Sequence, residues 1–195
     1  MNIEQLNQLV ERLSNTTSDI NEHIKTLALY SSKSKSVIEF GVRAIVSTWA
    51  LLSGQPKTMK SYDINHPSKH GSNIDDVYQT ANDIDVDYEF ILGNTLEVNI
   101  PECDLLFIDT IHRYSQLKQE LEKHHAKVKK YIIFHDTVSF GNTDEFAEDP
   151  QSAKQGLLLA INEFLDQNNK WYILENFTNN NGLMILKNKE FENDQ

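Results

Sequence analysis

The segment CDLLFID, residues 103–109, constrains the fold of this chain more than any other feature. Its apolar residues follow one another without the alternation of a half-exposed strand, and it ends on Asp109. Such a run is typical of a strand buried on both faces of a parallel sheet. A second run, KYIIFHD at residues 130–136, has the same character and ends on His135-Asp136. The helical spacing of residues 114–128 between them predicts a crossover helix, and thus an open α/β sheet.

The rest of the chain continues the alternation of strands and helices. Two apolar stripes with helical spacing predict cover helices within residues 1–35. Further strands are expected at SVIEFG (36–41), TMKSYDI (58–64) and DYEFILGN (87–94), and helices at about 47–52 and 74–81. Asp149-Pro150 is a good cap and first position for a helix through Leu157, Ile161, Phe164 and Leu165. WYILENF (171–177) and GLMILK (182–187) predict a terminal hairpin, followed by a frayed tail at 188–195.

Length and charge narrow the class of protein. The 195 residues suit a single domain, with an α/β core at 36–187. A net charge of -11 disfavours nucleic acid and anionic membranes as partners. The chain shows neither a signal peptide nor an apolar run of the ~20 residues that span a bilayer, so we expect a cytoplasmic protein. The single cysteine, Cys103, is interpreted as a small core residue rather than as a nucleophile.

The ends of the predicted strands carry the candidate site residues, because ligands of open α/β sheets bind beyond the carboxyl ends of the strands. Asp63 ends the second strand, where a carboxylate can accept hydrogen bonds from ribose hydroxyls, or can cap a turn. Gly93-Asn94 ends the third strand and is either an adenine contact or an ordinary turn pair.

Asp109 and Asp136 end two strands that should be neighbours, spaced ~4.8 Å apart. Two carboxylates so close favour either a shared divalent cation or one raised pKa, and oxygen ligands suit magnesium, calcium or manganese better than zinc. Two solvated helix caps are the alternative. His112 and His135 flank these aspartates, and either can take a proton from a substrate hydroxyl near neutral pH, or serve as a hydrogen-bonding support.

The succession VIEFGV, KSYDI, FILGNTLEV, CDLLFIDTIHRYSQLKQEL, KYIIFHDT and NGLMILK resembles a class I S-adenosylmethionine-dependent methyltransferase, from about Ser36 to Lys187. Within that superfamily it is similar to a small bacterial and phage branch with an ID..H.Y segment after the fourth strand and HDT after the fifth. The resemblance implies a Rossmann-like three-layer α/β/α sandwich. Its seven-stranded sheet would be mostly parallel, with an antiparallel last strand from the terminal hairpin.

The same resemblance implies roles for particular residues. Glu39 and Gly41 would border the methionine part of S-adenosylmethionine, Asp63 would hold its ribose, and Asn94 would lie near the adenine. In similar metal-dependent O-methyltransferases, acids at the positions of Asp109 and Asp136 bind a divalent cation such as Mg²⁺. Asp109 also counts among the cofactor contacts. The third metal ligand, usually an amide or acid, falls at Thr137, and threonine is a poorer ligand.

The leading prediction is O-methylation of a hydroxyl on a small molecule or on a sugar within a glycan, with His112, His135 or Asp109 as the base. Relatives usually have a small residue where Ile45 stands, and a branched side chain there narrows the space for the cofactor. The alternative is therefore a methyltransferase-like binding protein without transfer activity. A third possibility is a metal-dependent sugar-modifying or hydrolytic enzyme that uses Asp109 and Asp136 without the cofactor. The amphipathic first helix could cover the sheet or the second subunit of a homo-oligomer.

Overall fold

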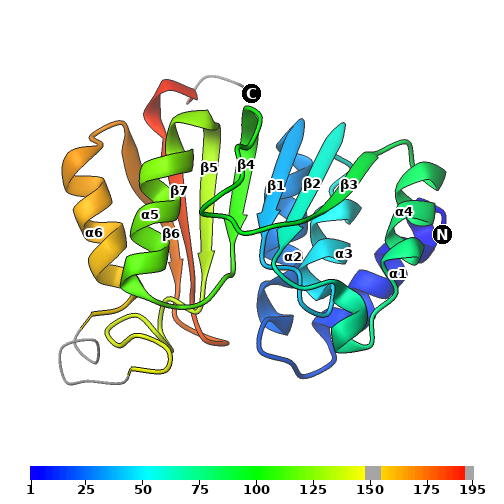
Figure 1. Cartoon of the computed structure of the whole chain (residues 1–195). Coiled ribbons are helices and arrows are strands. Elements are labelled where there is room, and N and C mark those ends of the chain that lie inside the picture. The colour runs from blue at the N-terminus through cyan, green and yellow to red at the C-terminus, as the bar shows by residue number, and fades with distance from the viewer. Residues whose placement is uncertain (148–154, 192–195) are drawn as a thin grey trace.

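The computed structural model describes residues 1–147 and 155–191 and shows one seven-stranded sheet with helices on both faces (Figure 1). The strand order is β3-β2-β1-β4-β5-β7-β6. The strands are β1 (Ser36–Phe40), β2 (Thr58–Asp63), β3 (Asp87–Leu92), β4 (Cys103–Ile108), β5 (Val128–His135), β6 (Trp171–Phe177) and β7 (Leu183–Asn188). The α-helices are α1 (Ile3–Ser14), α2 (Ile24–Ser32), α3 (Val46–Ser53), α4 (Ile74–Asp83), α5 (Tyr114–His124) and α6 (Leu157–Gln167).

The direction of the strands confirms the predicted topology. Strands β1 to β5 pair in parallel, whereas β7 pairs antiparallel with both β5 and β6. The order reverses between β1 and β4, because the chain leaves the β3 edge and returns to the middle of the sheet. This reversal is where open α/β sheets bind ligands.

Two hydrophobic clusters make the three layers. One cluster joins α1, α2, α3 and α4 to one face of the sheet, and the other joins α5 and α6 to the opposite face. Leu6 and Val10 of α1 are buried in the first cluster, so this helix covers its own chain. Strand β4 is buried along its whole length, as its apolar run predicts.

Local signals set the element boundaries where the side chains supply a cap. Asn2 and Gln5 form a capping box at the start of α1, and Asn73 caps α4 by accepting from the backbone N–H of Asp75. The predicted loop after β2 contains a short 3₁₀ helix, Pro67–His70, which begins at a proline.

Two predicted boundaries are wrong. Val128 was expected in the crossover helix but opens β5, because a 3₁₀ turn, His125–Lys127, ends the helical part early. The tail was expected to begin at residue 188, yet the buried Asn188 pairs with Trp171 and a 3₁₀ turn, Lys189–Phe191, follows. The predicted cap at Asp149-Pro150 lies outside the described residues. In the described part of the chain, no helix is long and apolar enough to cross a membrane.

Candidate functional site

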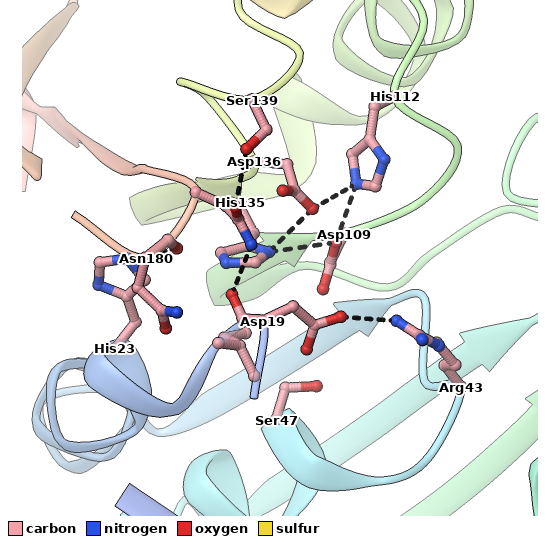
Figure 2. Close-up of polar contacts among 12 residues, drawn as sticks. Asp19, His23, Arg43, Ser47, Asp109, His112, His135, Asp136, Ser139 and Asn180 are labelled. Carbon is pink, nitrogen blue, oxygen red and sulfur yellow. Dashed lines mark hydrogen bonds and ion pairs between the residues drawn. The ribbon is translucent and has the colours of Figure 1, made fainter. Parts of the chain in front are cut away.

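Two carboxylates and two imidazoles meet at the carboxyl ends of β4 and β5 (Figure 2). His112 Nε2 lies 3.1 Å from Asp109 Oδ1 and 3.0 Å from Asp136 Oδ2. His135 Nδ1 lies 3.2 Å from the same oxygen of Asp136 and 3.5 Å from that of Asp109. The sheet explains this meeting, because Ile108 of β4 pairs with Phe134 of β5. Asp109 directly follows Ile108, and Asp136 lies two residues after Phe134. The expectation that the two aspartates are neighbours is confirmed.

Glu145 completes the cluster, and sequence reasoning missed it. Its Oε2 atom lies 2.9 Å from His112 Nδ1 and accepts the backbone N–H of His112 at 3.1 Å. The His112 ring also stacks on Phe140, with 4.8 Å between ring centroids and 4° between the planes. Glu145 belongs to a polar loop without periodicity or a strand end, so nothing in the sequence singled it out. Held on one edge and one face, the imidazole has a defined orientation.

His135 is almost completely buried, with a side-chain exposure of 1%. Neither of its ring nitrogens makes a hydrogen bond of good geometry with another described residue. A small cavity of about 10 Å³ lies beside it, lined also by Ile108, Phe134, Leu117 and Leu157, among others. This is about the space of one water molecule. Nδ1 of the ring faces Asp109 and Asp136, and the ring of His23 lies edge-on beside it, with 5.8 Å between the centroids.

The contacts in this cluster shift the pKa values of its members. Burial alone would lower the pKa of His112, but its interactions with Asp109 and Asp136 outweigh burial and raise the pKa to about 10. Burial would also lower the pKa of His135, but its interactions with Asp109 and Asp136 raise that pKa to about 10. Burial would raise the pKa of each aspartate, but the two imidazoles bring it below its usual range. With protein groups alone, the cluster is therefore two imidazolium ions paired with carboxylates.

Glu39 is the penultimate residue of β1 and has no exposed surface. Its carboxylate accepts hydrogen bonds from Ser47 Oγ at 2.6 Å, Thr48 Oγ1 at 2.9 Å and Ser61 Oγ at 2.6 Å. Burial raises the pKa of Glu39 to about 7, although the three hydroxyls oppose the shift. The carboxylate thus ties β1 to the first turn of α3 and to β2.

Gly41 and Asp63 together shape the loop that follows β1. Gly41 has a φ of 85°, and a Cβ atom built on it would lie 1.9 Å from the carbonyl oxygen of Asp109. Only glycine allows this approach of the β1 and β4 ends. Asp63 Oδ2 accepts the backbone N–H groups of Val42 and Arg43 at 2.8 and 3.0 Å, and Oδ1 accepts that of Asn65 at 2.7 Å. Three of the about four acceptor positions of the carboxylate are therefore used within the chain.

Ile45 occupies the position before α3 with a left-handed backbone, at a φ of 56°. Its side chain is only 6% exposed and belongs to the hydrophobic cluster that contains Trp49 and Val42. The branched side chain packs into the core, and the backbone conformation is one that favours glycine. Next to it, Arg43 forms an exposed ion pair of 2.7 Å with Asp19, beside Ser47 (Figure 2).

The remaining predicted site residues lie as follows. Asn94 lies in the loop after β3, where its Oδ1 accepts the backbone N–H of Leu96. Thr137 is buried, and its hydroxyl lacks a hydrogen-bond partner among the described residues. It lies beside Gly182, since a Cβ atom there would come within 2.8 Å of Thr137 Oγ1. Cys103 is buried in the core, which raises the pKa of its thiol.

One set of donor atoms in the described residues has the spacing of a metal site. It consists of one atom each from Asp109, His112 and Asp136, all within 4.8 Å of one another. Asp109 and Asp136 belong to the ligand set that the resemblance implies. The third member is His112 rather than Thr137.

No protein-family model matches the chain, and no curated protein sequence matches it. Solved structures do. An O-methyltransferase from Bacillus cereus in complex with SAH superimposes with a TM-score of 0.63 at 15% identity, over 96% of this chain and 90% of that one.

Two further structures agree. A putative caffeoyl-CoA O-methyltransferase from Staphylococcus aureus gives a TM-score of 0.60 at 18% identity, covering 95% of this chain and 98% of that one. An O-methyltransferase from Streptomyces achromogenes in complex with SAM gives 0.61 at 12% identity, covering 95% and 88%. The Rossmann-like fold expected from the resemblance is confirmed: this chain has the fold of class I O-methyltransferases.

Proposed function

We propose that this protein is an S-adenosylmethionine-dependent methyltransferase that acts on a hydroxyl group of a small molecule or of a sugar in a glycan. The observation that carries the proposal is the cluster of Asp109, His112, His135 and Asp136 at the strand ends of an O-methyltransferase fold. A cytoplasmic place of action belongs to the same proposal.

The loops around the β1 end fit the cofactor. Gly41 keeps the backbone of this turn close to β4, and Asp63 retains about one acceptor position for a ribose hydroxyl. The packing of Ile45 into the core supports the proposal, because a side chain in the core does not narrow the space for the cofactor. The proposed cofactor-binding residues are Glu39, Gly41, Asp63, Asn94 and Asp109. Glu39 is buried, so its role would be to hold α3 in place through its hydrogen bonds to Ser47 and Thr48.

The chain would supply orientation, charge and a proton acceptor. When bound, S-adenosylmethionine provides an electrophilic methyl group, and alignment with the acceptor oxygen accounts for most of the rate. Asp109, His112 or His135 would take the hydroxyl proton. An imidazole with a pKa of about 10 already holds a proton, so a histidine acts as the base only in its neutral state. A divalent cation beside Asp109 and Asp136 would provide the charge that keeps such a histidine neutral.

The second candidate is a binding protein without transfer activity. The observation in its favour is the use of Asp63, whose carboxylate already serves the backbone of Val42, Arg43 and Asn65. If those contacts are too rigid for a ribose, the site no longer takes the cofactor. Because a fold does not determine an activity, a binding measurement has to separate the two candidates.

The test is thermal unfolding with S-adenosylmethionine and with S-adenosylhomocysteine. A ligand at 100 times its dissociation constant stabilises a protein by about 2.7 kcal/mol, so a clear rise in Tm is expected. The Asp63→Ala variant should lose the rise. Asp63→Asn, which keeps an acceptor oxygen for the loop, controls for damage to the loop itself. Absence of any rise at millimolar ligand, with and without Mg²⁺, would contradict the proposed function.

A further inference from the structure

His112 is the only ring in the cluster whose tautomer the structure determines. Glu145 Oε2 lies 2.9 Å from Nδ1 and also accepts the backbone N–H of the same residue. A carboxylate only accepts hydrogen bonds, so the Nδ1 atom carries a proton. Nε2 faces Asp109 and Asp136, with either a lone pair or a second proton. Figure 2 shows the two aspartates on the side of the ring opposite the bond to the Cβ atom.

The distances around Nε2 match those of a coordination sphere. Ligand bonds of about 2.1 Å place two donors about 3.0 Å apart at a right angle and about 3.4 Å apart at a tetrahedral angle. Nε2 lies 3.0 Å from Asp136 Oδ2 and 3.1 Å from Asp109 Oδ1. One proton on Nε2 would serve only one of the two oxygens well, and only the contact with Asp109 has the geometry of a hydrogen bond.

His135 gives an independent indication of a ligand. Its side chain is 1% exposed, both ring nitrogens lack a hydrogen-bond partner among the described residues, and Nδ1 is directed at the two aspartates. Nδ1 of His135 lies 3.2 Å from Asp136 Oδ2, but without the geometry of a hydrogen bond. A buried polar group whose hydrogen bonds are not satisfied costs about 1–3 kcal/mol, so native structures rarely keep one without a reason. A cation bound between the two carboxylates would explain the arrangement, because the polar groups around it would then face a ligand that is not part of the chain.

We propose that Asp109, His112 and Asp136 bind one transition-metal cation of the Zn²⁺ or Co²⁺ class, and that Glu145 is a positioning residue that orients the His112 imidazole. Imidazole as a ligand favours these ions over Mg²⁺, whose sites consist of oxygen donors. Three protein ligands leave positions open for oxygen atoms of an acceptor. A carboxylate on the outer nitrogen of a ligating histidine is the usual arrangement in such sites. The site concerns the same strand ends as the proposed function but does not depend on methyl transfer.

The experiment uses the full chain, stripped of metal with a chelator. Co²⁺ is added while the visible absorption of the ion is recorded, and calorimetry with Zn²⁺ and Mg²⁺ follows. We expect one ion per chain, a Co²⁺ spectrum that differs from that of the aqueous ion, and displacement of Mg²⁺ by Zn²⁺ but not the reverse. Binding of S-adenosylhomocysteine is measured separately, so that failure of the metal site and failure of the proposed function are distinguished.

Four variants assign the ligands. Glu145→Ala removes the hydrogen-bonding partner of a ligand and should weaken Zn²⁺ binding about 10–100-fold. His112→Gln removes a ligand and should weaken it by more. Thr137→Val has nearly the same shape as the natural residue and should leave the affinity unchanged, whereas it would abolish binding if Thr137 were the third ligand. His70→Gln removes an exposed imidazole and controls for nonspecific binding of Co²⁺.

Two results would overturn the proposal. One is a chain that binds Mg²⁺ in preference to Zn²⁺ and loses it in Thr137→Val. The other is a chain without measurable affinity for any of these ions, in which nitrogen NMR shows a proton on Nε2 of His112. The NMR measurement needs no variant, so it remains decisive if His112→Gln fails to fold.

Discussion

Glu39 is an ionisable residue that is buried in the protein and has a structural role. Its carboxylate lies among three hydroxyls and has no contact with solvent. Burial raises its pKa to about 7 from an ordinary value of 4.5, so the folded state favours the protonated form. The resulting stability is complete below the ordinary pKa and is lost as the pH rises through 4.5 to about 7.

The Glu39→Gln variant tests this at the residue scale. It removes the charge but keeps the size and an acceptor oxygen. We expect the variant to be more stable than the natural protein at pH 8, by up to about 3 kcal/mol, because a shift of one pKa unit corresponds to about 1.4 kcal/mol. The gap should shrink toward pH 5. Urea unfolding at the two pH values measures it, and an equal difference at both would show that the carboxylate is not held protonated.

At the scale of elements, the ends of β1 and β4 meet at a single glycine. The left-handed backbone of Gly41 and the carbonyl of Asp109 leave no room for a side chain. Gly71 offers a matched control, since its φ of 75° is similar and a Cβ atom there would meet nothing within 4 Å. A side chain at either position would strain the backbone, but only at Gly41 would it also overlap with neighbouring atoms.

We therefore compare Gly41→Ala with Gly71→Ala. The control should lose only the strain of a left-handed alanine, about 1–2 kcal/mol. Gly41→Ala should lose this amount and about 1–3 kcal/mol more from overlap, and should displace Asp109 from its partners. Chemical denaturation measures both changes. Equal losses in the two variants would mean that the β1 end can move away from β4 without cost.

At the scale of the whole molecule, the segment before α2 is fastened to the β6–β7 turn. The Asn180 side chain accepts the N–H of Glu22 at 3.0 Å and donates to the carbonyl oxygen of Ser18 at 2.9 Å. His23 Nε2 lies 3.0 Å from the carbonyl oxygen of Asn179, and its ring meets that of His135 edge-on. Residues far apart in the chain thus form one side of the site (Figure 2).

The Asn180→Gly variant removes both side-chain hydrogen bonds while keeping the left-handed backbone, whose φ is 42°. Each such bond contributes about 0.5–1.5 kcal/mol, so local opening should become easier by about 1–3 kcal/mol. Hydrogen exchange should accelerate at the amide of Glu22 and stay unchanged at Leu106 in the centre of the sheet. Unchanged exchange at Glu22 would show that other contacts suffice to hold the segment.

The sequence by itself determined the elements and the strand ends. Apolar runs such as 103–109 report burial residue by residue, and a parallel sheet places their terminal carboxylates at one edge. For this reason the sequence predicted the open α/β sheet and, at its strand ends, Asp109, Asp136 and the flanking histidines as site candidates. The errors at Val128 and at Asn188 are errors of boundary, where a short 3₁₀ turn and a cross-strand pair override local periodicity.

Only the tertiary structure decided how the site residues are used. Glu145 reaches His112 from 33 positions away because of the path of a loop, which hydrophobic periodicity does not encode. Whether Ile45 faces the core, and whether Glu39 meets hydroxyls or solvent, depends on how α3 is placed against the sheet. Strand identity follows from local burial, whereas the partner of a polar side chain follows from long-range packing, and the latter exists only once the chain has folded.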